Sequence, residues 1–343
     1  MLSYILKRVG LALVTGFIIV TMSFLLIKLL PYEKPLGQDE KRYSVYQKEI
    51  SLGYIFSSPV KLDDYRWIDT TEVNGKTEHF YEVPVFDQYL KWVGNIVFRW
   101  DWGVSTKILP GNSAMSIMMR DLPVTIKINI WSVLLSVPLG ILLGIWAALK
   151  KNTTVDHTIS TSIMVFSSIP SFVMITVFML LLCYNTGWLP TQWPADGSPA
   201  DVQFKGYIIP VICLSYGSIA GYARAVRAEL CEVMSSDYLL LARTKGLTKN
   251  QAITRHALRN AMVPIVPGIL AEVIGLLSGS MILEQLYGIP GVGRLYVTAL
   301  NQRDFNVLFT DMALFTMIGL LAAVVLDLSY GFIDPRIRMG AKK

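Results

Sequence analysis

The sequence predicts an all-α polytopic membrane protein with six transmembrane helices and a folded extracytoplasmic insert between the first and second of them. Of its 343 residues, 53% are hydrophobic and only 16% are charged, which is less charge than a soluble domain usually carries. The apolar residues gather in runs with at most one charge, long enough for a membrane-spanning helix, which needs about 20 residues. The basic residues cluster between particular runs, as orientation in a membrane requires.

Six apolar runs are the predicted spans. They cover residues 9–30, 128–149, 158–182, 206–223, 261–283 and 312–333. Glu272 interrupts the fifth run and Asp327 the sixth. An acid at that depth is either functional or hydrogen-bonded between helices, and both interpretations stay open. Three Gly-x-x-x-Gly pairs, which begin at Gly140, Gly217 and Gly275, predict close packing between helices.

The distribution of basic residues predicts the orientation of the spans. Lysines and arginines precede the first run, follow the second, fill the segment after the fourth and close the chain. Few occur in residues 183–205 and 284–310, after the third and fifth runs. Both termini and the basic segment are therefore expected in the cytoplasm. Because orientation explains most of the net charge of +6, nucleic acid is not an expected partner.

Residues 31–120 are expected to form the extracytoplasmic insert. The segment mixes both charges with many tyrosines and tryptophans, and is too aromatic for a disordered linker. Residues 71–83 predict a β-hairpin around Asn74 and Gly75. The insert either meets a partner or serves as a structural lid, and the sequence favours neither.

The sequence predicts no catalytic centre, no bound cofactor and no metal site. Its three cysteines lie in or beside apolar runs, without the paired spacing of a disulfide framework or a zinc site. Its three histidines lie in different segments. The phosphate-binding Gly-x-x-x-x-Gly-Lys-Ser/Thr string is absent from the sequence, so ATP would have to be hydrolysed by another chain. A membrane-embedded enzyme would need clustered catalytic groups, and none converge.

The polar, basic segment 228–260 between the fourth and fifth spans is the most informative part of the chain. Residues 228–242 predict one helix, which Gly246 ends in a left-handed conformation. Thr248 is predicted to cap a second helix toward Asn260, so that the two helices form a protruding elbow. A solvated loop that only sets orientation is the plain alternative. The elbow is favoured by an ordered set of residues: Ala242, Gly246, His256, Arg259 and Asn260.

This segment resembles the coupling-loop signature of ABC-importer permeases of the oligopeptide/dipeptide/nickel group. The resemblance rests on Asp237-Tyr238, Ala242-Arg243-x-Lys245-Gly246-Leu247 and His256-Ala257-Leu258-Arg259-Asn260-Ala261. Other segments that resemble the family are Trp102-Gly103-x-Ser105, Asp121-Leu122-Pro123-x-Thr125, residues 284–295, Arg303-Asp304-Phe305 and Asp334-Pro335-Arg336-Ile337-Arg338. The resemblance covers nearly the whole chain outside residues 32–98. It departs in the long insert and at Ala323, where the family often has Asn.

The resemblance implies a type I ABC-importer permease fold and a set of partners. A second homologous permease would complete a heterodimer, two ABC ATPases would hold ATP and Mg, and an extracytoplasmic binding protein would deliver cargo. The chain would be the first permease subunit, in the lipid of a bacterial cytoplasmic membrane. Oligopeptides lead as cargo, dipeptides follow, and nickel or another small solute is the alternative. An ion-coupled secondary transporter is an alternative of another class, although the two halves show no internal repeat.

The resemblance also implies functional residues. The expected ATPase-coupling set is Asp237, Tyr238, Ala242, Arg243, Lys245, Gly246, His256, Arg259 and Asn260. Within it, the small Ala242 would permit close approach, Gly246 would set the angle of the elbow, and the cations would pair with ATPase acids or lipid headgroups. A gate or receptor face is expected at Glu284, Pro290, Gly291, Gly293 and Arg294. The expected divisions are residues 1–30 (first helix), 31–120 (insert), 121–333 (permease core) and 334–343 (cytoplasmic tail).

Overall fold

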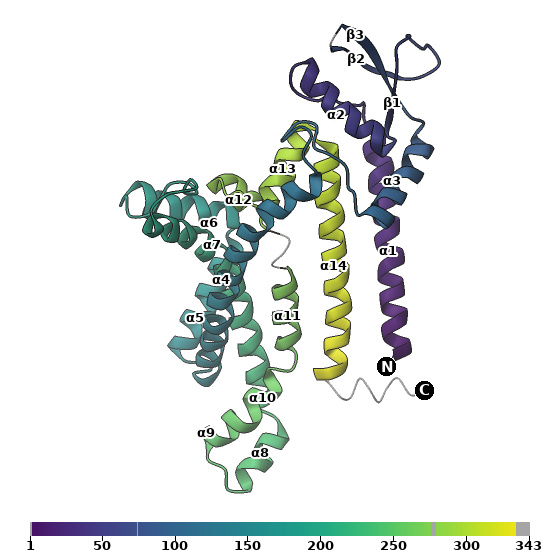
Figure 1. The fold of residues 1–343 in the computed structure, drawn as a ribbon. Coiled ribbons are helices and arrows are strands. Elements are labelled where there is room, and N and C mark those ends of the chain that lie inside the picture. The colour runs from purple at the N-terminus through teal and green to yellow at the C-terminus, as the bar shows by residue number, and fades with distance from the viewer. Residues whose placement is uncertain (1, 74, 276–278, 334–343) are drawn as a thin grey trace. The chain divides into compact units, whose positions relative to one another are not determined.

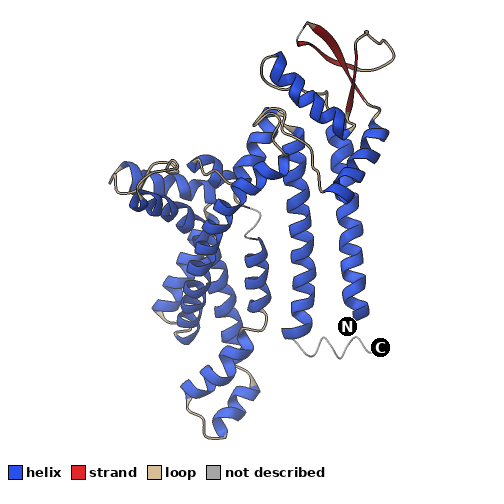
Figure 2. Cartoon of the chain, viewed as in Figure 1, coloured by secondary structure: helices blue, strands red, loops and turns tan. Residues whose placement is uncertain are grey.

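The computed structural model describes residues 2–73, 75–275 and 279–333. Asn74, the Asp-Pro-Arg-Ile-Arg segment and the rest of the expected tail 334–343 lie outside the described residues. The described chain is helical apart from one small sheet (Figure 2). It divides into two compact units, Met1–Val124 with Pro290–Leu320 and Thr125–Ile289 with Leu321–Lys343.

The first unit contains the sheet and the helices around it. It includes three helices, α1 (Leu2–Lys28), α2 (Asp39–Leu52) and α3 (Val85–Arg99), and three strands, β1 (Ile55–Ser58), β2 (Trp67–Val73) and β3 (Lys76–Glu82). The strands are antiparallel in the order β1-β3-β2. The predicted hairpin is confirmed, because Val73 pairs with Lys76 and Gly75 has a φ of 72°. Strand β1 and helices α2 and α3 were not predicted.

Aromatic side chains form the core of this first unit. Tyr46 of α2 stacks on Phe80 of β3 with ring centroids 4.4 Å apart. Trp92 of α3 and Phe309 of α14 (Phe305–Ile333) form a T-shaped pair with ring centroids 4.7 Å apart. Phe24 of α1 packs on the same tryptophan at 4.8 Å. The many aromatics of the insert therefore build a folded core, since such rings bury large apolar areas.

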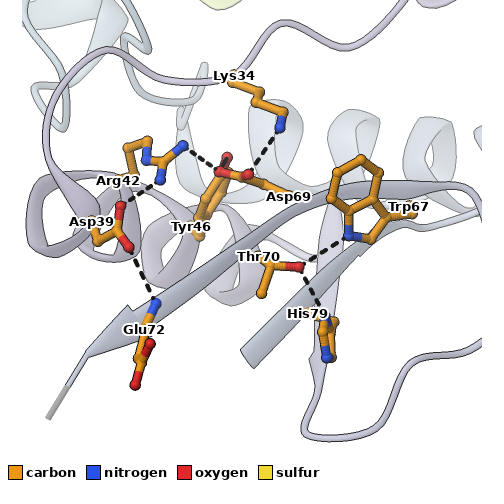
Figure 3. A network of polar contacts seen from close by, with 9 residues as sticks. All are labelled: Lys34, Asp39, Arg42, Tyr46, Trp67, Asp69, Thr70, Glu72 and His79. Carbon is orange, nitrogen blue, oxygen red and sulfur yellow. Dashed lines mark hydrogen bonds and ion pairs between the residues drawn. The ribbon is translucent and has the colours of Figure 1, made fainter. Parts of the chain in front are cut away.

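A buried carboxylate joins three segments of the insert (Figure 3). Asp69 of β2 is only 4% exposed. It accepts hydrogen bonds from Lys34 Nζ and the Tyr46 hydroxyl, each at 2.9 Å, and pairs with Arg42 at 2.8 Å. A carboxylate removed from water needs such partners. The network therefore fixes the residues before α2, the helix itself and the sheet in one arrangement.

The second unit consists of helices. They are α4 (Ala114–Leu149, which starts in the first unit), α5 (Thr154–Ser168), α6 (Ser171–Phe178) with the π-helical turn η1 (Met179–Tyr184), α7 (Ala200–Met234), α8 (Asp237–Thr244), α9 (Lys249–Ala252), the π-helical turn η2 (Ile253–Ala257), α10 (Leu258–Ala261), α11 (Ile265–Gly275) and α12 (Met281–Tyr287). The first unit also contains α13 (Val292–Gln302), and α14 begins in the first unit and ends in the second.

Four described helices are long and apolar enough to cross a membrane: Leu6–Lys28, Ala114–Leu149, Ala200–Met234 and Phe305–Ser329. Two helix pairs are bent, Thr154–Ser168 with Ser171–Tyr184 by 100° and Lys249–Ala261 with Ile265–Gly275 by 53°. If each pair is one span, the number rises to six. The run 206–223 proves to be the middle of the longer α7.

The run 158–182, predicted as one span, is bent by 100° between Thr154–Ser168 and Ser171–Tyr184. Ile169 adopts extended backbone angles, with φ −87° and ψ 123°, immediately before Pro170. Proline disfavours the helical conformation of the preceding residue and donates no backbone hydrogen bond. Pro210 lies inside α7 without ending it. The outcome at a proline therefore depends on the packing around it.

One of the three glycine pairs packs as predicted. A Cβ at Gly140 would lie 2.6 Å from the Cβ of Tyr222, and one at Gly144 would lie 2.7 Å from the carbonyl oxygen of Ala223. These glycines thus let α4 approach the backbone of α7. At Gly217 and Gly221, by contrast, a Cβ would meet no described atom within 4 Å. The third pair flanks residues 276–278, which lie outside the described residues.

Candidate functional site

The expected coupling segment forms an elbow of short helices beyond the end of α7. Helix α8 leads into a turn at residues 245–247, and α9, η2 and α10 return toward α11. In Figure 1 the turn between α8 and α9 projects past the ends of α5 and α11, which belong to the same compact unit. The elbow predicted from the sequence is therefore present in the structure.

The prediction of one helix over residues 228–242 is wrong, because α7 ends at Met234 and α8 begins at Asp237. The Ser235 hydroxyl donates to the carbonyl oxygen of Glu232 at 2.8 Å, and the Ser236 hydroxyl donates to that of Val233 at 2.6 Å. Such local hydrogen bonds compete with continued helix. The break adds a second corner to the elbow.

The turn of the elbow has both predicted features, a glycine with positive φ at Gly246 and a helix N-cap at Thr248. Gly246 has a φ of 96° and a Cβ there would meet no described atom within 4 Å, so conformation and not crowding favours glycine. The Thr248 hydroxyl accepts a hydrogen bond from the backbone N–H of Gln251 at 3.3 Å. The Gln251 side chain accepts one from the Thr248 N–H at 3.1 Å. This reciprocal capping box starts α9 and fixes the direction of the second arm.

A small apolar core attaches the elbow to the long helices. Leu239 of α8 is buried with Ala252, Ile253, Ala257 and Ala261 of the returning arm. The same cluster includes Ala148 at the end of α4 and Leu230 near the end of α7. Since both arms share buried contacts with two long helices, the elbow is a fixed projection of this unit and not a loose loop.

The nine expected coupling residues are largely accessible. Eight of them are exposed, and Ala242 is half-buried. Across the described ranges, no side chain of this set makes a hydrogen bond or an ion pair. The cationic groups of Arg243, Lys245 and Arg259 are thus unpaired within the described chain. An exposed, unpaired positive surface is available to an acidic partner.

Helix α8 also exposes apolar side chains that the sequence reasoning did not single out. Leu240 is 62% exposed and Leu241 is 56% exposed, whereas the preceding Leu239 is 5% exposed. A hollow of about 360 Å³ between α8 and α9 is lined in part by Leu240, Arg243 and Lys249. Apolar surface rimmed by polar residues is typical of a protein contact. Three consecutive leucines in a short helix could have predicted this exposed apolar surface, because only one of them can face the core.

The expected gate or receptor face is largely buried in this chain. Glu284, in the second unit, is 3% exposed and accepts a hydrogen bond from the Thr125 hydroxyl at 3.0 Å. Gly291 lies immediately before α13 in the first unit, and Gly293 is buried. Pro290 and Arg294 are half-buried. Glu284 thus joins two segments that carry the family resemblance, through a hydrogen bond inside the second unit.

No group of three or more His, Cys, Asp or Glu side chains within residues 2–73, 75–275 and 279–333 is arranged to hold a metal ion.

Comparison with known proteins gives matches across the whole chain. Residues 140–339 match the family described as "Binding-protein-dependent transport system inner membrane component". The dipeptide transport system permease protein DppB of Lactococcus lactis subsp. cremoris is 31% identical over 99% of this chain and 100% of its own length. The oligopeptide transport system permease protein OppB of Haemophilus influenzae is 30% identical over 98% of this chain and 100% of its own length.

The fold is also similar to that of a solved transporter. A chain of the MetNI methionine ABC transporter, in an inward-facing conformation, aligns with a TM-score of 0.52 and 18% identity. The alignment covers 64% of this chain and 97% of the MetNI chain. At that identity the likeness concerns the fold alone.

Proposed function

The chain belongs to the binding-protein-dependent transport system inner membrane component family, and we propose that it is the first permease subunit of an ATP-driven peptide importer. The supporting observation is that relatives named as dipeptide and oligopeptide permeases align over their entire length with nearly the entire chain. Oligopeptides are the proposed cargo. The chain itself forms part of the path, and ATP with Mg is held and hydrolysed on partner ATPases.

We further propose that each bent helix pair is one span, which gives six spans in a multi-pass protein of the bacterial cytoplasmic membrane. Residues 31–120 then form the extracytoplasmic insert, and both termini lie in the cytoplasm. The exposed cations of the elbow support this orientation, because cytoplasmic segments carry an excess of Lys and Arg.

The elbow is the proposed contact with an ATPase. Its exposed leucines would bury apolar area against the ATPase, and the unpaired Arg243, Lys245 and Arg259 would meet acidic groups there. Because the elbow shares a buried core with α4 and α7, a displacement of the ATPase would move those helices as one body. A second homologous permease and its own ATPase would complete the path, and an extracytoplasmic binding protein would supply the peptide.

Cysteine labelling tests the orientation and the ATPase contact together. Lys245→Cys places a thiol at the exposed turn of the elbow, in a Cys231→Ser background since the two other cysteines are buried. Lys61→Cys is the matched control, at an exposed position of the insert. In intact cells a membrane-impermeant thiol reagent should label only Lys61→Cys, and in inside-out vesicles only Lys245→Cys. A cross-linker should capture an ATPase only from Lys245→Cys.

The opposite labelling pattern, or absence of ATPase capture from the elbow in membranes that import peptide, would contradict the proposal. Cargo is tested by uptake of a labelled oligopeptide and of Ni²⁺ in cells with and without this chain. Loss of peptide uptake alone supports the peptide importer, and loss of Ni²⁺ uptake alone would replace it with the nickel alternative.

A further inference from the structure

A polar groove runs between α7 and α11. It consists of two hollows, of about 320 and 250 Å³, that share Ser218 and Glu272 in their linings. One hollow extends along Tyr222 and Glu229, and the other extends to Asn129 of α4. Because both hollows are lined by the same two side chains, they are adjoining parts of one groove along the helices.

Helical spacing explains why the groove exists. On α7 the lining residues Ser218, Tyr222, Ala225 and Glu229 recur every three or four positions, so they share one face of the helix. On α11 the lining residues Ile265, Gly268, Glu272 and Gly275 recur in the same way. Small side chains are frequent on both faces. Gly221, Gly268 and Gly275 each border space in which a Cβ would meet no described atom within 4 Å.

All charged side chains that line the groove in the described chain are negative. Glu272 and Glu229 contribute carboxylates, and no Lys, Arg or His is among the residues that line either hollow in the described chain. The Tyr222 hydroxyl donates a hydrogen bond to one carboxylate oxygen of Glu272. No other described residue donates to this side chain. An ionised acid inside a membrane span is costly unless it is paired. The Glu272 carboxylate has one described donor and can accept further hydrogen bonds from a cation or another donor group.

We propose that Glu272 binds the positively charged amino terminus of a peptide as it passes through the permease. This inference rests on the proposed function. The amino terminus is the one cation that unmodified peptides share whatever their side chains, so a single carboxylate serves many sequences. Asn129 and Ser218 line the same groove with neutral polar side chains that suit peptide amides. Glu229 extends the negative surface along α7.

The test uses the complete importer, reconstituted in vesicles with its receptor and ATPases, and the uptake rate of a peptide with a free amino terminus. Glu272→Gln keeps the size of the side chain and removes its charge, and should lower uptake roughly tenfold, the effect of losing one hydrogen bond to a charged group. Glu272→Asp keeps the charge and should restore most of the rate. Asp201→Asn, which removes an exposed acid at the start of α7, should transport like the unaltered complex.

A second measurement leaves Glu272 intact and reports what occupies the groove. Ser218→Cys, in the Cys231→Ser background, should react with a small thiol reagent, and peptide cargo supplied during turnover should protect it. Protection that needs cargo supports the proposal even if Glu272→Gln fails to assemble. A thiol that peptide cargo never protects and that a thiol cross-linker joins to the second permease would make the groove a subunit interface, and would overturn the inference.

The two proposals fail in different ways. If the unaltered complex imports peptide and Glu272→Gln imports it at the same rate, the inference is wrong and the proposed function stands. If the unaltered complex imports no peptide, the proposed function is wrong and this inference falls with it.

Discussion

The hydroxyl of Ser105 donates a hydrogen bond of 2.6 Å to the carboxylate of Asp304, 199 residues further along the chain. The same carboxylate accepts the backbone N–H groups of Lys107 and Ile108 at 3.0 Å each, and that of Thr106 at 3.3 Å. Asp304 is fully buried. Two segments that carry the family resemblance therefore meet at one carboxylate, which holds the loop before α4 against the start of α14.

Replacement of Asp304 by Ala should destabilise the first compact unit strongly. Several buried donors would lose their acceptor at once, and each unsatisfied donor costs about 1–3 kcal/mol, so the free energy of unfolding should fall by about 3 kcal/mol or more. Ser105→Ala removes one donor and should cost about 1 kcal/mol. Thermal and denaturant unfolding of the purified chain in detergent measure both. Asp63→Ala, at an exposed position, is the control. Equal losses from Ser105→Ala and Asp304→Ala would contradict this account.

Gly246→Val should separate ATP hydrolysis from transport. Its φ of 96° is unfavourable for a β-branched residue, and the left-handed conformation should cost about 1–2 kcal/mol. Since a side chain would meet open space, the variant should fold with an altered angle between α8 and α9. We expect ATP hydrolysis without uptake in the assembled complex. Gly246→Asn, which tolerates this conformation better, should retain coupling. Normal uptake by Gly246→Val at native expression levels would refute the role of this turn.

Local patterns in the sequence predicted local structure well. Gly246 and Thr248 form the predicted turn and cap, because left-handed φ and N-capping depend on a residue and its near neighbours. The hairpin at residues 71–83 could be predicted for the same reason, because its turn depends on neighbouring residues. The break at Ser235 and Ser236 was missed because hydrophobic periodicity continues through it, and only the two serine–carbonyl hydrogen bonds reveal why the helix ends.

Features that depend on distant contacts could not be read from the sequence. Pro170 and Pro210 look alike as prolines in apolar runs, yet one lies at a 100° bend and the other inside a continuous helix. Glu284 and Thr125 each belong to a recognisable segment, but their hydrogen bond spans 159 residues. The groove beside Glu272 needs two helix faces to be placed together. In each case the local structure depends on packing between segments that are distant in the sequence, and a single sequence does not specify that packing.

An ion pair between α5 and α7 should be essential for stability of the second compact unit. Asp156 is 1% exposed, and its two oxygens meet Arg227 Nε at 2.5 Å and a terminal nitrogen of Arg227 at 2.8 Å. Asp156→Ala would leave the guanidinium without its partner, and we expect a loss of about 3 kcal/mol in unfolding free energy. The double variant Asp156→Leu with Arg227→Met should lose less than the sum of the single changes. Additive losses in a double-mutant cycle would show that the two residues act independently.

The stability of the first compact unit should also depend on pH through Glu49. This residue of α2 is 3% exposed, and the Tyr32 hydroxyl donates a hydrogen bond of 2.5 Å to it. Burial raises the pKa of Glu49 above its usual 4.5, although the Tyr32 hydrogen bond and the charge of Lys28 oppose the rise. The folded chain therefore holds this proton more tightly than the unfolded chain does. Between the two pKa values it binds more protons, so its free energy of unfolding falls as pH rises.

Glu49→Gln should remove this dependence. The glutamine keeps an oxygen that can accept the Tyr32 hydrogen bond and has no charge to desolvate, so the variant should be more stable than the natural chain above the raised pKa. The measurement is the thermal midpoint of the purified chain in detergent from about pH 5 to pH 8, where the usual carboxyl pKa has been passed. Glu40→Gln, at an exposed position of the same helix, should keep the slope of the natural chain. Parallel curves for the natural chain and Glu49→Gln would show that the buried carboxylate is not the source of the pH dependence.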